Sequence, residues 1–322
     1  MLPLMHRVLG CLQGIAAGDA VGKQTENLAH GDVRRWYPSG LDGFVGAPGT
    51  PIPRYRQHKR REWLIGETTD DTERTLAVAR AIIRDGEVHH ATVGAEMLSC
   101  HKSVHAGVRS LYEFHEASDP TRVASGHDGC GAAIRVAPVG LLYRPGRLSD
   151  IVASAREASI STHSGVRAIV AAAANAAAVS AAVEGDGPDR VVAVAKRAAA
   201  IAESAATGDV SGIFAKAFDN ALVVVGRTVE PNVGAIAAAC FPDHTFAIVS
   251  LALALAVTGS ARRAILAATN VGGDSDSVAS IAGGIAGAID PTSVPSDWSA
   301  IVEEVNGLDL RSFAAAIAVL RL

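Results

Sequence analysis

The sequence is poor in aromatic residues and in charged residues. Aromatic side chains make up 4% of the 322 residues and charged side chains 19%, below the roughly 25% of an average soluble domain. Because 49% of the residues are still hydrophobic, small and aliphatic side chains carry the apolar content. Such a composition suits closely packed helices and excludes disorder over most of the chain. The 29 basic and 33 acidic residues give a net charge of −4, which argues against a nucleic-acid partner.

Cysteine is also scarce, and its spacing excludes several kinds of site. Cys11, Cys100, Cys130 and Cys240 are scattered singly, and no CxxC pair occurs. This spacing supports neither a zinc ribbon nor a dithiol redox centre. The density of cysteines is far below that of a small secreted domain held together by disulfides. We therefore expect a reducing, cytoplasmic setting.

Long hydrophobic runs that would cross a membrane are not expected. The stretch Phe246–Val257 is the most suggestive, but it falls short of the roughly 20 residues that span a bilayer. The first 20 residues are fairly apolar, yet they lack the strong basic start of a signal peptide. We predict that Phe246–Val257 is a buried core helix and that the protein has no membrane partner.

Helical periodicity dominates the chain, and most prolines fall between the periodic stretches. Residues 36–66 form the one extended irregular region, and neither a low-complexity linker nor a fixed-period repeat is present. These observations predict an all-α fold in which residues 1–322 form a single domain. The expected helices are Leu4–Val21, Thr72–Arg84, Thr92–Glu116, Ile151–Ser159, Val166–Val183, Arg190–Thr207, Ser211–Gly226, Val233–Ala239, Phe246–Thr258, Ala261–Thr269, Ser277–Ile289 and Leu310–Leu320.

The first expected helix combines a glycine face with acidic residues near its end. Gly10, Gly14 and Gly18 stand four residues apart, so they share one face on which a neighbouring backbone can approach closely. Asp19 follows directly and Glu26 lies a few residues later, in a loop. Asp19 is equally consistent with a hydrogen-bond acceptor at a helix end, and Glu26 with a solvated loop acid.

Three oxygen-bearing side chains open the helix that begins near residue 70. Thr69, Asp70 and Asp71 would present hydroxyl and carboxylate oxygens at one helix start, as a hard divalent cation needs. The alternative is a capping box in which Asp70 pairs with Glu73 at the positive end of the helix.

A second acidic helix start follows a Gly-Gly pair near residue 272. Asp274 and Asp276 are two residues apart, and the hydroxyl of Ser277 comes next. Two carboxylates so close together repel each other unless a cation offsets the repulsion, although a simple helix cap is the alternative. Because neither acidic cluster has a histidine or cysteine beside it, the pattern favours Mg²⁺ or Mn²⁺ over zinc.

Two further segments are candidates for ligand contact. The segment His127–Pro138 contains glycines whose backbone N–H groups can cradle a phosphate or a ribose. The segment Ser161–Ser164 brings a histidine between hydroxyl side chains.

Taken in order, these segments resemble one family. The sequences GDAVG with Glu26, TTDDT, GCGAAIRVAPVGL, THS and GGDSDSVASIAGGIAGA are similar to those of the ADP-ribosylglycohydrolases. That family includes the dinitrogenase-reductase-activating glycohydrolases and the ADP-ribosyl-acceptor hydrolases. The resemblance implies a compact orthogonal multi-helix all-α domain with a cleft for two Mg²⁺ or Mn²⁺ ions. It also implies hydrolysis of the glycosidic bond at C1″ of ADP-ribose in protein or small-molecule substrates.

The resemblance assigns roles residue by residue. It implies that Glu26, an acid near the scissile bond, acts in catalysis together with Asp71 and Asp274. The metal ligands that it implies are Thr69, Asp70, Asp71, Asp274, Asp276 and Ser277. The substrate-binding residues that it implies are Asp128, Gly129, Cys130, Gly131 and His163.

The departures from the family pattern lie around the ligand, except that Ser277 stands where threonine is common. Cys130 replaces an asparagine, Ile134 a methionine, and Gly165 a bulkier acid or histidine. They leave two alternatives open: hydrolysis of a nucleoside-like or biosynthetic ribosyl compound, and a non-catalytic member that binds ADP-ribose.

Two other features are expected to be unrelated to the chemistry. The basic run Arg54–Arg61 is interpreted as a solvated loop rather than a phosphate site. His101 and His105, spaced four residues apart on an expected helix, are interpreted as surface histidines rather than a metal pair.

Overall fold

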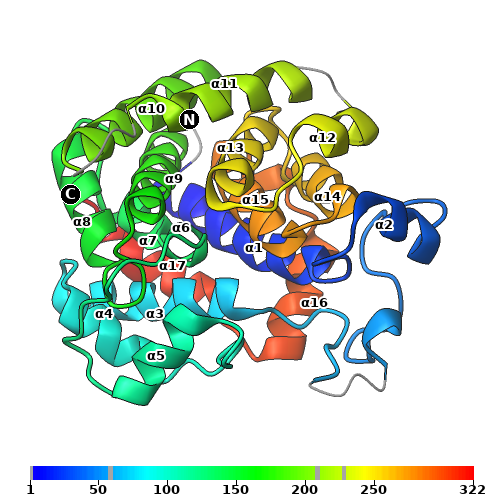
Figure 1. Ribbon diagram of the computed structural model, residues 1–322, viewed down its shortest axis with the longest axis horizontal. Coiled ribbons are helices and arrows are strands. Elements are labelled where there is room, and N and C mark those ends of the chain that lie inside the picture. Colours follow the sequence, from blue (N-terminus) through cyan, green and yellow to red (C-terminus); the bar gives the residue numbers. More distant parts are fainter. Residues whose placement is uncertain (1–2, 57–60, 207–210, 227–229) are drawn as a thin grey trace.

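A computed structural model describes residues 3–56, 61–206, 211–226 and 230–322. Within these ranges, the regular elements are α-helices and short 3₁₀ turns, and the only extended pairings are two isolated bridges. The all-α fold predicted from the sequence is therefore confirmed (Figure 1).

The helices confirm most of the sequence-based boundaries to within a few residues. They are α1 (Leu4–Gly22), α2 (His30–Trp36), α3 (Asp70–Asp85), α4 (His90–Met97), α5 (Arg109–Ala117), α6 (Gly131–Ile134), α7 (Ala137–Leu142), α8 (Leu148–Glu157), α9 (Val166–Glu184), α10 (Pro188–Ser204), α11 (Ile213–Val225), α12 (Val233–Ala239), α13 (Thr245–Ala256), α14 (Ala261–Val271), α15 (Ser275–Ile289), α16 (Ser296–Asn306) and α17 (Leu310–Ala318).

The close approach of α1 and α15 organises the centre of the molecule. A Cβ atom on Gly14 or Gly18 would overlap the backbone carbonyl of Gly283 or Ala279, so only glycine allows this separation. The glycine face predicted for the first helix is thus confirmed. Because the two helices run antiparallel, the C-terminal end of α1 meets the N-terminal end of α15.

The alanine-rich helix α9 forms a second part of the core, against α10, α7 and α8. By length and composition alone α9 could cross a membrane, but 83% of its apolar window is buried inside the structure. The shorter apolar helix α13 is also buried, as predicted for that stretch.

One predicted helix is divided into two. The expected helix over Thr92–Glu116 is replaced by α4 and α5, which are joined by an irregular segment. Ser103 in this segment has a φ of 58°, which a continuous α-helix does not accommodate. His101 and His105 therefore lie in a loop and do not share a helix face, although both are exposed as expected.

Several short helices were not predicted from the sequence. They are α2, α6, α7 and α16, and in α6 and α7 almost every residue is buried, so they lack an amphipathic period. The helix predicted over Arg190–Thr207 corresponds to α10, which ends at Ser204. Thr207, the predicted last residue, lies outside the described residues.

Candidate functional site

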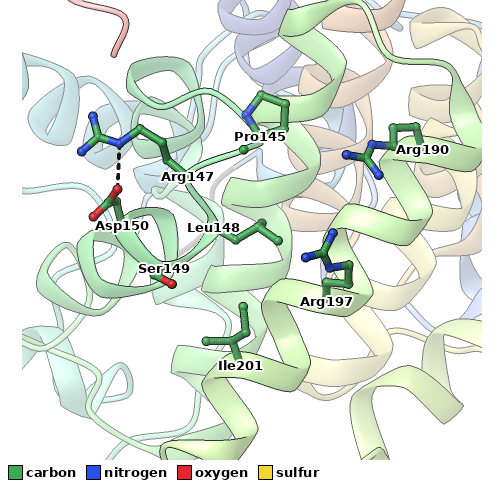
Figure 2. Close-up of a pocket in the computed structure, with 9 residues that line it drawn as sticks. Pro145, Arg147, Leu148, Ser149, Asp150, Arg190, Arg197 and Ile201 are labelled. Carbon is green, nitrogen blue, oxygen red and sulfur yellow. Dashed lines mark hydrogen bonds and ion pairs between the residues drawn. The ribbon is translucent and has the colours of Figure 1, made fainter.

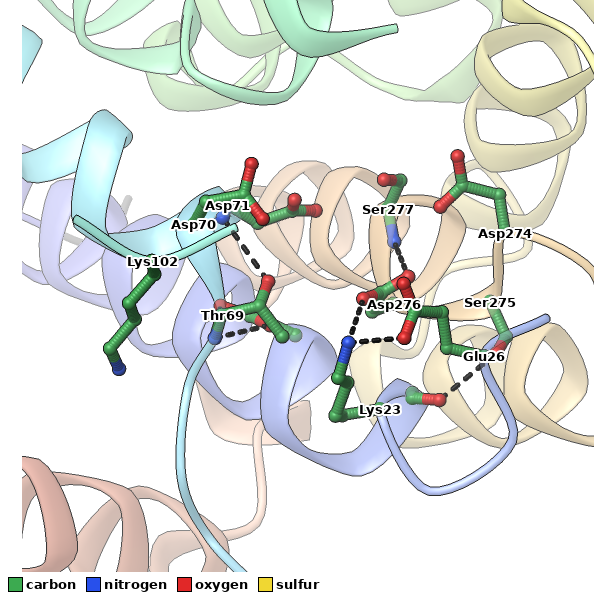
Figure 3. Close-up of polar contacts among 12 residues, drawn as sticks. Lys23, Glu26, Thr69, Asp70, Asp71, Lys102, Asp274, Ser275, Asp276 and Ser277 are labelled. Atoms are coloured by element: carbon green, nitrogen blue, oxygen red, sulfur yellow. Dashed lines mark hydrogen bonds and ion pairs between the residues drawn. The ribbon is translucent and has the colours of Figure 1, made fainter. Parts of the chain in front are cut away.

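The two acidic helix starts face each other across the junction of α1 with α15 (Figure 3). Asp71, on α3, is 3% exposed, and its Oδ2 atom has no hydrogen-bond partner among the described residues. Burial, together with the negative charges of Asp19, Asp276 and other acids, holds the pKa of Asp71 well above its usual range. The negative charges of segments far apart in the sequence therefore raise the pKa of the Asp71 carboxyl, which favours a cation near these acids.

Thr69, and not Asp70, caps α3. The Thr69 hydroxyl accepts a hydrogen bond from the backbone N–H of Asp71 at 3.2 Å. Glu73 is turned away and accepts bonds from the backbone amides of His101 and Lys102, so the alternative of a capping box between Asp70 and Glu73 is wrong. Asp70 instead lies 3.4 Å from the guanidinium of the buried Arg74, with its carboxylate partly exposed at the site.

The Asp19 side chain on α1 holds the start of α3 in place. Its carboxylate, fully buried on α1, accepts hydrogen bonds from the backbone N–H of Thr69 and from both the N–H and the hydroxyl of Thr72. Burial raises the pKa of Asp19, and these hydrogen bonds oppose the rise. Asp19 therefore positions the residues that face the site, and its oxygens are turned toward α3.

The second acidic segment is equally buried. Asp276 is 4% exposed, and its Oδ1 atom accepts a hydrogen bond from the backbone N–H of Ser277 at 3.1 Å. Burial, and then the negative charge of Glu26, raise the pKa of Asp276 well above its usual range, against the opposing charge of Lys23. Ser275 binds this segment to α1, because its hydroxyl donates to the carbonyl of Gly22 at 2.9 Å.

Lys23 is a site residue that the sequence-based interpretation missed. Its ammonium contacts the carboxylate of Glu26 and lies 3.7 Å from Oδ2 of Asp276 (Figure 3). Burial acts to lower the pKa of Lys23, but the charges of Asp276 and Glu26 outweigh burial and raise it above its usual value. The available signal was its place four residues after Asp19, one helical turn along the same face.

Glu26 lies in a loop that several partners hold in place. Tyr55 donates its hydroxyl to Oε2 of Glu26 at 3.1 Å. Arg54 donates to the backbone carbonyls of Lys23, Gln24 and Glu26. The interpretation of Arg54 as part of a solvated basic loop is therefore wrong at this residue, and residues 57–60 of that run lie outside the described residues.

The glycine turn at residues 129–131 lies against His163. A Cβ atom on Gly129 or Gly131 would stand 3.1 or 2.7 Å from the imidazole, so the two glycines make room for the ring. His163 is 4% exposed and its Nδ1 atom lies 2.7 Å from the hydroxyl of Thr162. Burial, and then the charges of Arg135 and other cations, hold the pKa of His163 well below its usual range, so the imidazole is neutral.

Asp128 is engaged with the start of α9. Its Oδ1 atom accepts hydrogen bonds from the backbone N–H groups of Arg167 at 2.8 Å and Ala168 at 3.4 Å. A Cβ atom on Gly165 would overlap this same oxygen, so the Asp128 carboxylate fills the space that the missing side chain leaves.

Cys130 faces the acidic cluster. Its thiol donates to Oδ2 of Asp274 at 3.3 Å and lies 3.9 Å from the hydroxyl of Ser277. Burial, and then the negative charge of Asp274, raise the pKa of the Cys130 thiol well above its usual range. The thiol therefore stays protonated and acts as a weak donor to a candidate metal ligand.

The donor set at this junction consists of carboxylate and hydroxyl oxygens, which suit a hard divalent cation. As arranged, however, no group of three or more His, Cys, Asp or Glu side chains among the described residues could hold a metal ion. The ammonium of Lys23 stands between Glu26 and Asp276 instead. The chemistry of the residues fits a divalent ion, and binding one requires these side chains to shift.

Two surface hollows lie away from the acidic helix starts. One, of about 420 Å³, is lined by residues 145–150 and by α10, and in it Arg147 is paired with Asp150 (Figure 2). Another, of about 600 Å³, lies over Gln13 and residues 291–303. Neither hollow is lined by the acidic helix starts, so we base the candidate site on the buried carboxylates.

Comparison with known proteins supports a single family over nearly the whole chain. The family model described as ADP-ribosylglycohydrolase matches residues 2–321. Uncharacterized protein YegU of Escherichia coli is 28% identical over 98% of this chain and 97% of its own length. An uncharacterized protein of Archaeoglobus fulgidus is 27% identical over 96% of this chain and 93% of its own length.

Two further matches carry a functional description. The ADP-ribosyl-[dinitrogen reductase] glycohydrolase of Rhodospirillum rubrum is 30% identical over 43% of this chain and 46% of its own length. A solved structure described as an ADP-ribosylglycohydrolase-related protein complex superposes with a TM-score of 0.71 and 23% identity, covering 99% of both chains. That likeness supports the fold.

Proposed function

The chain belongs to the ADP-ribosylglycohydrolase family, and from this premise we propose that it is a metal-dependent hydrolase with an ADP-ribosyl substrate. The bond cleaved would be the glycosidic bond at C1″ of ADP-ribose, in an ADP-ribosylated protein or small molecule. The family is a glycohydrolase family and is generally metal-dependent, which supports both parts of the proposal.

The observation that carries the proposal is the buried Oδ2 atom of Asp71, which lies opposite the start of α15 and has no hydrogen-bond partner in the part of the chain that the structure describes. Burial raises the pKa values of Asp71, Asp274 and Asp276, and the negative charges of neighbouring acids add to the rise. A folded protein tolerates such crowding when a cation balances it, and two Mg²⁺ or Mn²⁺ ions would do so. The residues that would hold them are Thr69, Asp70, Asp71, Asp274, Asp276 and Ser277.

The remaining chemistry falls to a small set of side chains. Bound divalent ions would supply a Lewis acid for the ribose hydroxyls and for water. Glu26, whose side chain is 21% exposed, can meet both solvent and substrate, and it would accept or return a proton. Asp71 and Asp274 would orient the reacting groups, and the transition state would resemble an oxocarbenium ion.

Cys130 favours a second candidate substrate, a smaller or nucleoside-like ribosyl compound. Its thiol is turned toward Asp274, so this position offers a bound ligand no amide group. In that case, the same metal chemistry would act on a substrate that needs fewer polar contacts.

We also propose that residues 1–322 form one domain that works in the reducing cytoplasm. The packing of α1 against both α16 and α17 supports one domain, because it joins the two ends of the chain. The four cysteines are free, which supports a reducing location.

A hydrolysis screen with Mg²⁺ or Mn²⁺ tests the proposal. Its substrates are ADP-ribosyl-arginine, ADP-ribosyl-serine, O-acetyl-ADP-ribose and simple nucleosides. We expect turnover of at least one of them, lost in Asp71→Asn and retained in Asp32→Asn, which alters an acid of α2 away from the site. Absence of turnover on every substrate, with ADP-ribose still bound, would favour the non-catalytic alternative.

A further inference from the structure

The acidic site contains a positive charge of its own, supplied by Lys23. This lysine is 4% exposed and lies at the end of α1, with its ammonium against Glu26 and 3.7 Å from Asp276. We propose that Lys23 is a built-in cation that competes with one of two divalent ions, on the Asp276 side of the site. The inference rests on the proposed function, because it assumes that this junction binds divalent ions.

The two halves of the site differ in the carboxylate oxygens that they offer to a divalent ion. On the α3 side, Oδ2 of Asp71 is buried and has no partner among the described residues. On the α15 side, Oδ1 of Asp276 accepts the Ser277 amide and Oδ2 faces the Lys23 ammonium. An ion therefore finds an available oxygen at Asp71, whereas at Asp276 it must displace or share with the ammonium.

The surroundings of Lys23 keep its ammonium in the site. The Nζ atom of Lys23 lies 4.3 Å from the centroid of the Trp63 ring and 5.8 Å from the centroid of the Tyr55 ring. Aromatic faces at such distances stabilise a cation. Tyr55 and Trp63 thereby stabilise the positive charge of Lys23 within the site.

The backbone around Lys23 is also fixed. Gly22 packs so closely on α15 that a Cβ atom there would stand 2.5 Å from the carbonyl oxygen of Ser275. The loop beyond Glu26 is paired with the residue before Asp274, because the amide of Asn27 donates to the carbonyl of Gly273 at 2.7 Å. The backbone on both sides of Lys23 is therefore held against the start of α15.

These contacts predict unequal affinities for two ions. We expect the wild-type protein to bind one Mn²⁺ ion on the Asp71 side and a second at least about ten-fold more weakly. Opposite charges a few ångströms apart in a partly buried site interact strongly enough for this difference. Without divalent ions, Lys23 would offset the repulsion between Glu26 and Asp276.

The test counts bound Mn²⁺ by isothermal titration calorimetry and by the loss of free Mn²⁺ signal in electron paramagnetic resonance. In Lys23→Met, which removes the charge, the second ion should bind at least about ten-fold more tightly than in the wild type. In Lys23→Arg, which keeps the charge, it should stay within about three-fold of the wild type. The matched control is Lys102→Met, because Lys102 is a partly buried lysine that contacts Thr68 and Asn306 and touches neither Glu26 nor Asp276.

Equal Mn²⁺ affinities in Lys23→Met and the wild type would overturn the inference, as would an equal gain in Lys102→Met. If Lys23→Met is unstable without metal, Lys23→Gln and the Mn²⁺-induced rise in Tm replace it, and the rise should exceed that of the wild type. Tighter Mn²⁺ binding in Lys23→Met without hydrolysis of any ADP-ribosyl substrate would support the inference while the proposed function fails. Hydrolysis of an ADP-ribosyl substrate, with no effect of Lys23→Met on Mn²⁺ binding, would support the proposed function and overturn the inference.

Discussion

The carboxylate of Asp19 on α1 accepts hydrogen bonds from both the backbone amide and the hydroxyl of Thr72 on α3. A third bond comes from the amide of Thr69, the residue that caps α3. Asp19 therefore holds the start of α3 in place. We expect Asp19 to affect metal binding indirectly, through the positions of Thr69 and Asp71.

Asp19→Asn should therefore reduce stability and metal binding together. Replacing a buried carboxylate that accepts these bonds by an amide should lower the free energy of unfolding by about 2–3 kcal/mol. Urea unfolding in EDTA measures this loss, and calorimetry should show weaker Mn²⁺ binding. The control is Asp309→Asn at the exposed N-cap of α17, which should lose less stability and leave Mn²⁺ binding unchanged. Normal Mn²⁺ affinity in Asp19→Asn would argue against this positioning role.

Glu26→Gln should separate catalysis from metal binding. Its amide still accepts a hydrogen bond from Tyr55 but can no longer exchange a proton. We expect turnover to fall by at least about 10²-fold, the low end for a lost acid or base, with the first Mn²⁺ ion still bound. Steady-state kinetics on the best substrate measures the change, and Glu62→Gln, an exposed acid of the segment 36–66, is the control. A near wild-type rate would make Glu26 a surface acid.

Sequence pattern predicted the features of this site that are local. The helix starts at Thr69–Asp71 and Asp274–Ser277, and the glycine face of α1, depend on residues a few positions apart. The roles of Lys23 and Asp128 depend on which distant backbone packs against them. The position of Lys23 opposite Asp276 follows from the α1–α15 crossing, which no local pattern contains.

The same limit applies to the glycines around the ligand. Gly129 and Gly131 were expected to offer backbone N–H groups to a ligand, and in the fold they also make room for the imidazole of His163. The space that a side chain on Gly165 would need is occupied by the carboxylate of Asp128. Each outcome depends on a side chain from another segment that local residue patterns do not specify.

His163 should make the protein less stable in mild acid. Its pKa is held well below its usual range in the folded state, while in the unfolded chain it takes up a proton below about pH 6.5. The unfolded state then binds more protons, so the free energy of unfolding falls as the pH drops below 6.5. The loss should approach about 1.4 kcal/mol per pH unit.

Urea unfolding between about pH 7.5 and 5.5 measures this dependence. His163→Gln should remove that part of the slope, although it also lowers stability at neutral pH. The exposed His105 supplies the control, since His105→Gln should leave the slope as it is. An unchanged slope in His163→Gln would show that other groups cause the acid sensitivity.

Gly165→Ala should destabilise the protein through Asp128. The added Cβ would overlap the Asp128 oxygen that accepts the first amides of α9, so that bond must break or α9 must shift. We expect a loss of about 1–3 kcal/mol in the free energy of unfolding. Gly187→Ala is a matched control, because Gly187 also precedes a helix with similar backbone angles and has nothing within 4 Å of an added Cβ. Equal losses in the two variants would exclude crowding as the cause.

Cys130 is the residue through which ligand affinity should respond most directly. Its protonated thiol donates weakly to Asp274, and the position presents no amide to a ligand. In Cys130→Asn, the amide can donate to Asp274 and also offer a polar contact to ADP-ribose. A polar contact to a buried ligand group corresponds to roughly 1–3 kcal/mol, so affinity for ADP-ribose should rise by about ten- to a hundredfold.

Calorimetry with ADP-ribose in the presence of Mg²⁺ measures this gain. Cys130→Ser is the matched control, since its hydroxyl keeps a donor toward Asp274 and adds no amide group, and its affinity should stay within about three-fold of the wild type. Higher ADP-ribose affinity in both variants would mean that the Cys130 thiol lowers affinity by weakening the metal site, and that the missing amide group is not the cause. Submicromolar ADP-ribose binding by the wild-type protein would remove the argument for a smaller ribosyl substrate. Full ADP-ribosyl compounds would then remain as the substrates to test, because the carboxylates at Asp71, Asp274 and Asp276 are the same in either case.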